Sequence, residues 1–163
     1  MPASRRAGAL LHLTALLLVP LLLLVAPPLL SVSGVAQARE MVSVTRPGIN
    51  MRDGPGTRHK ALWSLARGYP LEVIGRRGGW YRVRDFERDI GWIHAPLAGR
   101  IPHHIVKARI ANIRSAPGMR SRILGKAVYG DVLRTVEKRR EWVKIRAEGG
   151  LIGWISRKLL WGW

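Results

Sequence analysis

Residues 49–56 read INMRDGPG and residues 111–118 read ANIRSAPG, so one segment of the chain recurs 62 positions later (111 − 49 = 62). In both copies apolar and polar residues alternate, as in a half-buried strand, until turn-forming residues follow. The run Gly-Trp-Ile recurs at the same offset, at 91–93 and at 153–155. A repeat of this length predicts a small domain that is used twice, because solenoid units are about 20–50 residues long.

The rest of each copy has short strand patterns separated by turns. Residues 71–74 and 80–84 in the first copy, and 132–136 and 142–146 in the second, combine β-branched, aromatic and alternating polar residues. Five or so short strands, spaced about 8–12 residues apart, are typical of a small barrel or sandwich. We therefore expect an all-β fold with two small barrels in tandem.

The N-terminal segment has the pattern of an export signal. Arg5 and Arg6 precede an apolar run at 10–25, and Ala36-Gln37-Ala38 forms an A-x-A cleavage site. We predict a signal peptide over 1–38 and export to the periplasm. An uncleaved membrane anchor is the alternative, because the apolar stretch continues to Leu30.

These features together give a domain plan for the whole chain. The signal peptide covers 1–38, the first domain 39–98, a short linker 99–104 and the second domain 105–163. Pro and Gly residues in the connection indicate an ordered link rather than a long flexible tether.

The composition favours anionic partners. The chain has 28 Lys and Arg against 10 Asp and Glu, and no Cys. Arg5 and Arg6 belong to the signal, so the exported part carries +16 (28 − 2 − 10). This balance favours attraction to an anionic envelope polymer or lipid, whereas export makes nucleic acid a poor candidate. Without Cys there is neither a disulfide nor a thiol ligand or nucleophile.

The order of the repeated motifs resembles the bacterial SH3 (SH3b) family over nearly all of the exported part. The resemblance implies a five- to six-stranded SH3-like barrel for each copy, and attachment to cell-wall peptides or a targeting role beside a hydrolase. We interpret twelve repeated residues as the structural motif of the fold: Asn50, Arg52, Pro55, Gly56, Gly91, Trp92, Asn112, Arg114, Pro117, Gly118, Gly153 and Trp154.

Ligand contacts are expected beside the first aromatic residue of the strand at 80–84 and its counterpart. In SH3-like barrels this aromatic commonly lines the ligand groove, and an indole offers a large contact area at a small entropy cost. The loop after the Asn-x-Arg strand is basic in both copies, which disfavours a basic proline-rich peptide and favours carboxylates or phosphates. The candidate ligand-binding residues are Trp80, Tyr81, Arg58, Lys60, Trp142, Arg120 and Arg122.

The other repeated and paired residues are expected to have structural roles. Asn50 and Asn112 are expected to satisfy backbone groups of the following turn, and Trp92 and Trp154 to pack in the core. His103 and His104 are adjacent on an extended chain, so their side chains point to opposite sides and chelate a metal poorly. We therefore expect no metal site.

Neither catalysis nor a cofactor is indicated. The chain lacks the G-x-S-x-G and H-E-x-x-H motifs, a Cys–His pair and carboxylates that recur between the copies. Two barrels also occupy the whole exported part. The predicted function is non-catalytic binding to the cell envelope, through peptidoglycan or another anionic component. The alternative is a periplasmic protein–protein adaptor, or a regulatory subunit of a separately encoded envelope enzyme.

Overall fold

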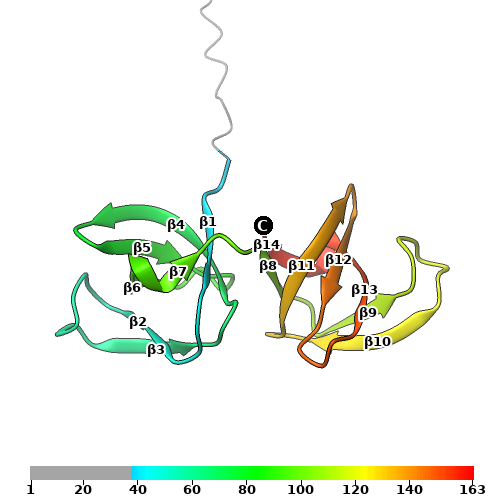
Figure 1. The fold of residues 1–163 in the computed structure, drawn as a ribbon, viewed down its shortest axis with the longest axis horizontal. Helices are drawn as coiled ribbons and strands as arrows, with labels where there is room; N and C mark the ends of the chain where they lie inside the picture. The colour runs from blue at the N-terminus through cyan, green and yellow to red at the C-terminus, as the bar shows by residue number, and fades with distance from the viewer. Residues whose placement is uncertain (1–37) are drawn as a thin grey trace, which may run out of the picture. The chain divides into compact units, whose positions relative to one another are not determined.

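The computed structural model describes residues 38–163 as an almost purely β structure (Figure 1). The predicted signal peptide falls almost entirely on residues 1–37, outside the described residues. The only helical segments described are two short 3-10 turns, η1 (Ala95–Leu97) and η2 (Arg157–Leu159). No helix in the described residues is long and apolar enough to cross a membrane. The predicted all-β class is confirmed.

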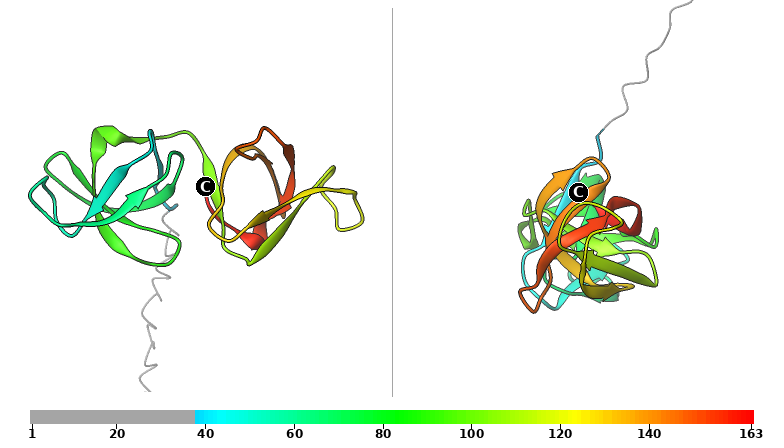
Figure 2. Two further views of the ribbon diagram at one scale, coloured as in Figure 1. Left: turned by 90° about the horizontal axis from the view of Figure 1, so that it is seen from below. Right: turned by 90° about the vertical axis from the view of Figure 1, so that its right-hand side faces the viewer.

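The first copy forms a seven-stranded antiparallel sheet that curls into a small barrel, here called the first barrel (Figures 1 and 2). The strands neighbour one another in the order β3-β2-β6-β5-β4-β1-β7. They are β1 (Met41–Val44), β2 (Ile49–Arg52), β3 (Ala61–Leu65), β4 (Pro70–Arg77), β5 (Trp80–Arg84), β6 (Ile90–His94) and β7 (Ala98–Gly99).

The second copy repeats this topology in the second barrel, with the order β10-β9-β13-β12-β11-β8-β14. The sequence repeat is therefore a repeat of the fold. The strands are β8 (His103–Val106), β9 (Ile110–Arg114), β10 (Ile123–Val128), β11 (Val132–Arg139), β12 (Trp142–Arg146), β13 (Ile152–Ser156) and β14 (Leu160–Gly162).

Two strands in each sheet go beyond the sequence-based expectation. Strands β3 and β10 follow the basic loops, and the very short β7 and β14 pair with the opening strands β1 and β8. The apolar pattern of β3 is weak, because four of its five residues are exposed. Strand β7 has only two residues, so its sequence has no period to detect.

Each barrel has its own apolar core, built from alternate residues of its strands. The first core gathers Val42, Val44, Ile49, Met51, Leu65, Leu71, Val73, Val83 and Ile93. The second gathers Val106, Ala111, Ile113, Ala127, Leu133, Val143, Ile145, Ile155 and Leu160. Strand β1 is buried on both faces, since Ser43 is only 2% exposed. The opening strand, which lies between β4 and β7, is thus buried on both faces rather than half-buried.

The Gly-Trp-Ile run recurs in both copies because its glycine lies where each barrel closes. Strand β6 meets β2 through the single pair Arg52–Trp92. A Cβ atom on Gly91 would lie 2.5 Å from Cγ of Met51 and 2.9 Å from the carbonyl oxygen of Arg52. Real Cβ atoms essentially never come this close to other atoms, so only glycine permits the approach. Gly91 therefore lets the first barrel close.

The second barrel closes in the same way. Strand β13 meets β9 through the pair Arg114–Trp154. A Cβ atom on Gly153 would lie 2.5 Å from Cγ2 of Ile113 and 2.8 Å from the carbonyl oxygen of Arg114. Both closures therefore require a residue without a Cβ atom, and the repeat has glycine at both positions.

The tryptophans of these closing strands lie outside the two clusters of core residues; Trp154 is buried as expected, whereas Trp92 is only half-buried. Ile93 and Ile155, the next residues along each strand, point into the cores. Trp154 is nevertheless buried, because Arg139 and Lys144 lie over its ring at 5.2 and 5.8 Å from the centroid. Long basic side chains cover the indole on the outer face through their stems and through cation–π attraction.

Replacing the closing glycines should destabilise the barrels. We expect Gly91→Ala and Gly153→Ala each to lower the free energy of unfolding by about 1–3 kcal/mol, the usual cost of overpacking. The added methyl group meets a backbone oxygen that has little room to move. Chemical denaturation measures the loss.

Two matched Gly→Ala variants control for the general effect of adding a methyl group. At Gly75 the nearest atom to an added Cβ is 3.5 Å away, and at Gly149 nothing lies within 4 Å. Both controls should change stability by less than the closing glycines do. Equal losses in all four variants would contradict the closure argument.

The adjacent histidines of β8 occupy different environments. His104 is 2% exposed, and its Nδ1 lies 2.7 Å from Oγ1 of Thr135. Burial lowers the pKa of His104 to about 4. Nδ1 of His103 lies 2.9 Å from the carbonyl oxygen of Ile101. His104 is therefore a neutral core histidine near pH 7.

Acid should weaken the second barrel through His104. In the unfolded chain this histidine titrates near pH 6.5, whereas in the fold its pKa is about 4. The stabilising contribution is present above pH 6.5 and is lost as the pH falls towards 4, because the unfolded state then binds more protons. Between pH 7 and pH 5 we expect a loss on the order of 2 kcal/mol from this residue.

Denaturation of the parent chain and of a His104→Gln variant at pH 7 and pH 5 measures this effect. The variant lacks the titrating ring and should lose less stability than the parent between the two pH values. An identical pH dependence in both proteins would contradict the assignment of His104 as a neutral buried histidine.

Candidate functional site

A groove of about 540 Å³ lies on the first barrel, beside the strands that close it. Strands β2, β5 and β6 supply one part of its lining, and the loops after β1 and β2 and the short turn η1 supply the rest. None of the described residues that line it is acidic. The lining residues are Arg46, Gly48, Ile49, Asn50, Arg52, Gly56, Thr57, Trp80, His94 and Leu97.

Two aromatic rings form the wall of this groove. Trp80 begins β5 and His94 ends β6, and the two residues are directly paired across the strands. Their ring centroids lie 5.2 Å apart at an interplanar angle of 56°. Both side chains are half-buried, so the rings keep part of their surface accessible. Such a surface suits flat or aliphatic ligand groups.

Arg52 fixes the loop that borders the groove. Its Nη1 donates a hydrogen bond of 2.7 Å to the carbonyl oxygen of His59, and Nδ1 of His59 lies 3.2 Å from Oδ1 of Asp53. In the second barrel, Nη1 of Arg114 donates to the carbonyl oxygen of Ser121 at 2.8 Å. Since the same bond recurs in both copies, these arginines hold the loop between the second and third strands of each barrel.

Arg46 and Asn50 are polar residues of the groove lining that are open to a ligand. Both side chains are exposed. Within residues 38–163, Arg46 takes part in none of the ion pairs. Asn50 was expected to satisfy the backbone of the turn, but no hydrogen bond joins its amide to the turn in the described residues. A guanidinium and an amide of the groove lining are thus available to a ligand.

The predicted ligand-binding residues of the first copy occupy three different places. Trp80 lines the groove as expected. Tyr81 packs against the apolar core, with the guanidinium of Arg76 lying 5.3 Å from its ring centroid. Arg58 and Lys60 are exposed on the loop between β2 and β3 and are not among the residues that line the groove.

In the second copy, Trp142 begins β12 at the position equivalent to Trp80 and is half-buried. Its partner across the strands is Ser156, where the first barrel has His94. Arg120 and Arg122 are exposed on the loop before β10. Ser121, between them, donates hydrogen bonds to the carbonyl oxygens of Ala116 and Gly118 and so orders that loop.

Sequence reasoning missed Arg46 and His94. Both stand at positions where the copies differ, since the equivalent residues are Ala108 and Ser156 (46 + 62 and 94 + 62). The prediction was built on residues that recur, and recurrence selects for the fold. Differences between the copies were the signal that could have pointed to these two residues.

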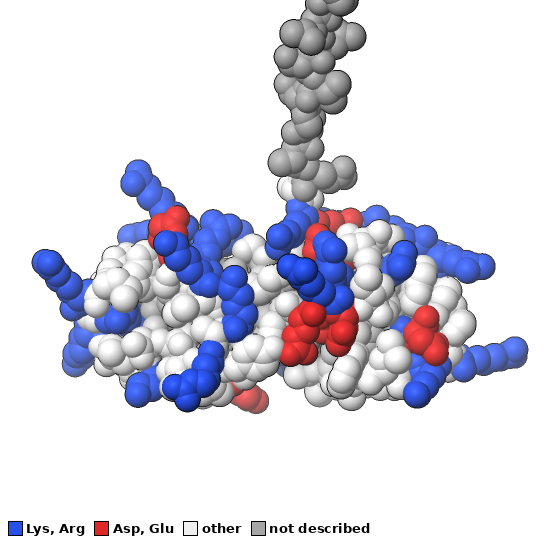
Figure 3. All heavy atoms as spheres, turned by 180° about the vertical axis from the view of Figure 1, so that it is seen from behind, with Lys and Arg blue, Asp and Glu red and all other residues white. Residues whose placement is uncertain are grey.

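Lys and Arg side chains outnumber Asp and Glu on the face drawn in Figure 3. Residues 39–163 contain 26 Lys and Arg against 10 Asp and Glu. Carboxylates within 4 Å engage only four of the arginines: Arg76, Arg84, Arg100 and Arg139. Most basic side chains in this part of the chain are therefore unpaired, which creates a positive field for anionic partners.

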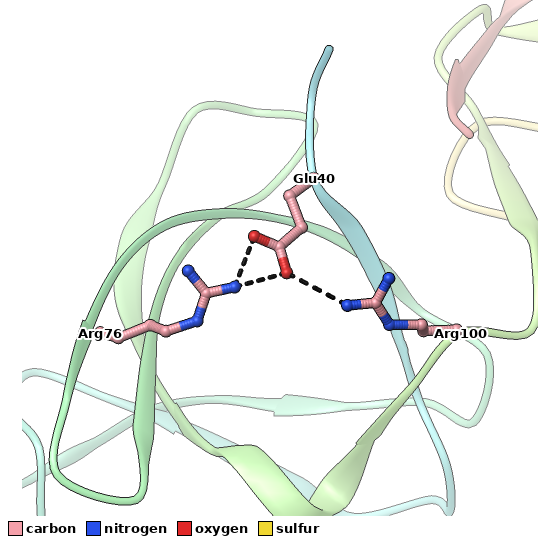
Figure 4. A network of polar contacts seen from close by, with 3 residues as sticks. All are labelled: Glu40, Arg76 and Arg100. Atoms are coloured by element: carbon pink, nitrogen blue, oxygen red, sulfur yellow. Dashed lines mark hydrogen bonds and ion pairs between the residues drawn. The ribbon is translucent and has the colours of Figure 1, made fainter. Parts of the chain in front are cut away.

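The largest ion-pair group of the first barrel has a structural role (Figure 4). Glu40 precedes β1 and lies between two arginines. Nη2 of Arg76 donates to both of its carboxylate oxygens at 2.5 Å, and Nη2 of Arg100 lies 3.7 Å from Oε1. The pairs link the entry to β1 with β4 and with the segment after β7. Exposed pairs of this kind contribute little to stability, because solvent screens them.

The carboxylate oxygens of Asp85, Glu87 and Asp89 lie within 4.8 Å of one another, as in some metal sites. The hydrogen bonds among the described residues show that this cluster orders a turn. Oδ1 of Asp85 accepts hydrogen bonds from the backbone N–H groups of Glu87 and Asp89, at 2.9 and 2.8 Å. Burial raises the pKa of Asp85 above its usual value. We assign this cluster to the stability of the turn.

Comparison with known proteins agrees with this architecture. A family model described as "Bacterial SH3 domain" matches residues 46–98, and a second model with the same description matches residues 110–160. Among curated proteins, YrvJ of Bacillus subtilis strain 168, which is named as a candidate N-acetylmuramoyl-L-alanine amidase, is 22% identical over 139 residues. The match covers 74% of this chain and 26% of YrvJ. The chain thus spans about a quarter of that relative.

Two solved structures, NlpC2 and NlpC1 of Trichomonas vaginalis, are each 21% identical to the chain, with TM-scores of 0.34 and 0.33. The matches cover 77% and 83% of this chain, and 48% and 50% of those chains. The family models match both barrels, and the sheet order is the same in both. The chain belongs to the bacterial SH3 family and carries two of its domains in tandem.

Proposed function

We propose that this protein is a non-catalytic binding protein of the bacterial cell envelope, with peptidoglycan as its ligand. The observation that carries the proposal is the groove of the first barrel, where the Trp80–His94 wall meets exposed cationic and amide groups. Bacterial SH3 domains are cell-wall binding modules. A relative named for cleaving an N-acetylmuramoyl–alanine bond supports a ligand built from wall sugars and peptides.

The residues of the groove suit binding better than catalysis. Its titratable members are two arginines and one histidine, and none of the described lining residues is a carboxylate or a nucleophile paired with a base. General acid–base and nucleophilic catalysis require such groups within hydrogen-bond reach of each other. The proposed role is therefore to hold the envelope polymer while a separate protein acts on it.

The surface charge and the tandem arrangement would strengthen attachment. Unpaired Lys and Arg side chains attract an anionic polymer. Salt limits the range of this attraction to the Debye length, about 10 Å at 0.1 M ionic strength. Two modest sites on one short connection gain affinity by effective concentration when both engage one repetitive polymer. Export to the periplasm, which the N-terminal sequence predicts, would place the barrels where such a polymer is found.

Co-sedimentation with purified peptidoglycan sacculi tests this function, using residues 39–163, which contain every strand of both sheets. We expect binding at both low and high salt. Trp80→Ala should weaken it about tenfold or more, because buried aromatic anchors commonly contribute more than 1.4 kcal/mol to binding. Binding that disappears at high salt in the parent chain would contradict specific recognition of the wall.

Trp63→Ala is the matched control. Trp63 is 54% exposed on β3 and is not among the lining residues of the groove. This variant should sediment like the parent chain. If the two tryptophan variants bound equally well, the groove would not be the binding site, and the alternative of a protein–protein adaptor would replace wall binding.

A further inference from the structure

The two barrels share one fold but differ at the positions that line the groove. Five of the ten lining residues are retained at the 62-residue offset: Asn112, Arg114, Gly118, Trp142 and Leu159. The other five change. Arg46, Gly48, Ile49, Thr57 and His94 become Ala108, Ile110, Ala111, Met119 and Ser156.

These changes leave no open cationic side chain at the positions of the second barrel that are equivalent to the groove lining. Arg114 is retained, but its Nη1 donates to the loop, as that of Arg52 does in the first barrel. Arg46, the exposed guanidinium that makes no ion pair within residues 38–163, becomes Ala108. Arg109 follows Ala108, but it stands at the position of Pro47, which is not among the residues that line the first groove.

The second barrel presents apolar groups instead. Ile110 is 44% exposed and Met119 is 71% exposed. Ser156 replaces the ring of His94, so Trp142 has no aromatic partner across the strands. The equivalent surface therefore combines one indole with aliphatic and thioether groups, which offer no charge to an anion.

We propose that recognition of an oxyanion, a carboxylate or a phosphate, is confined to the groove of the first barrel, where Arg46 pairs with it and the Trp80–His94 wall contacts the adjoining part of the ligand. This inference rests on the proposed function and names the chemistry of its ligand. A guanidinium binds a carboxylate or a phosphate through parallel N–H···O bonds. The amide of Asn50, which also lines the groove, supplies a further donor.

The test is an NMR titration of ¹⁵N-labelled residues 39–163, following the indole N–H signals of Trp80 and Trp142. Three probes are added separately: N-acetyl-trialanine with a free terminal carboxylate, the same peptide with an amidated terminus, and glycerol 3-phosphate. We expect an oxyanion probe to shift the Trp80 signal and to leave Trp142 unchanged. The amidated peptide should bind about tenfold more weakly than the carboxylate, since it lacks the charged partner of Arg46.

The carboxylate and phosphate probes distinguish the two sources of the oxyanion. A shift by N-acetyl-trialanine would identify a peptide carboxylate, and a shift by glycerol 3-phosphate alone would identify a phosphate-bearing polymer or lipid. Equal shifts by the carboxylate and amide peptides, together with no shift by glycerol 3-phosphate, would overturn the proposal. Equal shifts of Trp80 and Trp142, or no shift of Trp80 by either oxyanion, would also overturn it.

Two variants assign the effect to the groove. Arg46→Ala should weaken binding of the oxyanion probe about tenfold. Arg67→Ala is the matched control, because Arg67 is exposed on the same barrel and lies outside the groove lining. It should bind like the parent chain. Equal weakening in both variants would show that only the net charge matters, and would overturn the assignment to Arg46.

An exchange of residues between the barrels tests the same point without changing the formal charge. A chain with Arg46→Ala, His94→Ser, Ala108→Arg and Ser156→His should bind the oxyanion probe beside Trp142 rather than Trp80. A signal that stays at Trp80 would overturn the proposal. If these experiments failed while sedimentation with sacculi still depended on Trp80, the proposed wall binding would stand and only the oxyanion chemistry would be wrong.

Discussion

The close approach of the closing strand to the second strand is the constraint on which each barrel depends. Gly91 and Gly153 allow β6 to meet β2 and β13 to meet β9, where any Cβ atom would collide with a side chain and a carbonyl oxygen. Closure encloses the apolar core, and it also brings the groove together. Asn50 and Arg52 of β2 lie beside Trp80 of β5 and His94 of β6 only because β6 lies between β2 and β5. The core and the groove thus both depend on the close approach that these glycines allow.

Residues that recur between the copies and residues that differ have separate roles. The recurring arginines Arg52 and Arg114 hold a loop through the same backbone hydrogen bond, and the recurring glycines close the sheets. By contrast, Arg46 and His94 occur in the first groove alone. Duplication preserves what folding needs, so the ligand specificity of each barrel is free to change at the remaining positions.

The sequence predicted the fold well because the repeat exposed its invariant positions. Two all-β domains and their motif residues followed from that pattern, and the groove position of Trp80 followed from the resemblance to SH3-like barrels. It predicted the site less completely. Whether Asn50 faces the turn or the groove, and whether Trp92 and Trp154 face the core, depends on which face of each strand turns inward. Tertiary packing decides the inward face where apolar and polar residues do not alternate clearly. Tyr81 lies on the core side of β5, and Arg46 and His94 lacked any repeated pattern.

Hydrogen–deuterium exchange in the presence of solubilised peptidoglycan fragments tests the central claim most directly, because it reports on every backbone N–H of both barrels at once. The account predicts that the fragments slow exchange in residues 46–57 and around Trp80 and His94, which together line the groove of the first barrel. Slower exchange in the second barrel alone, or no change in either barrel, would contradict it.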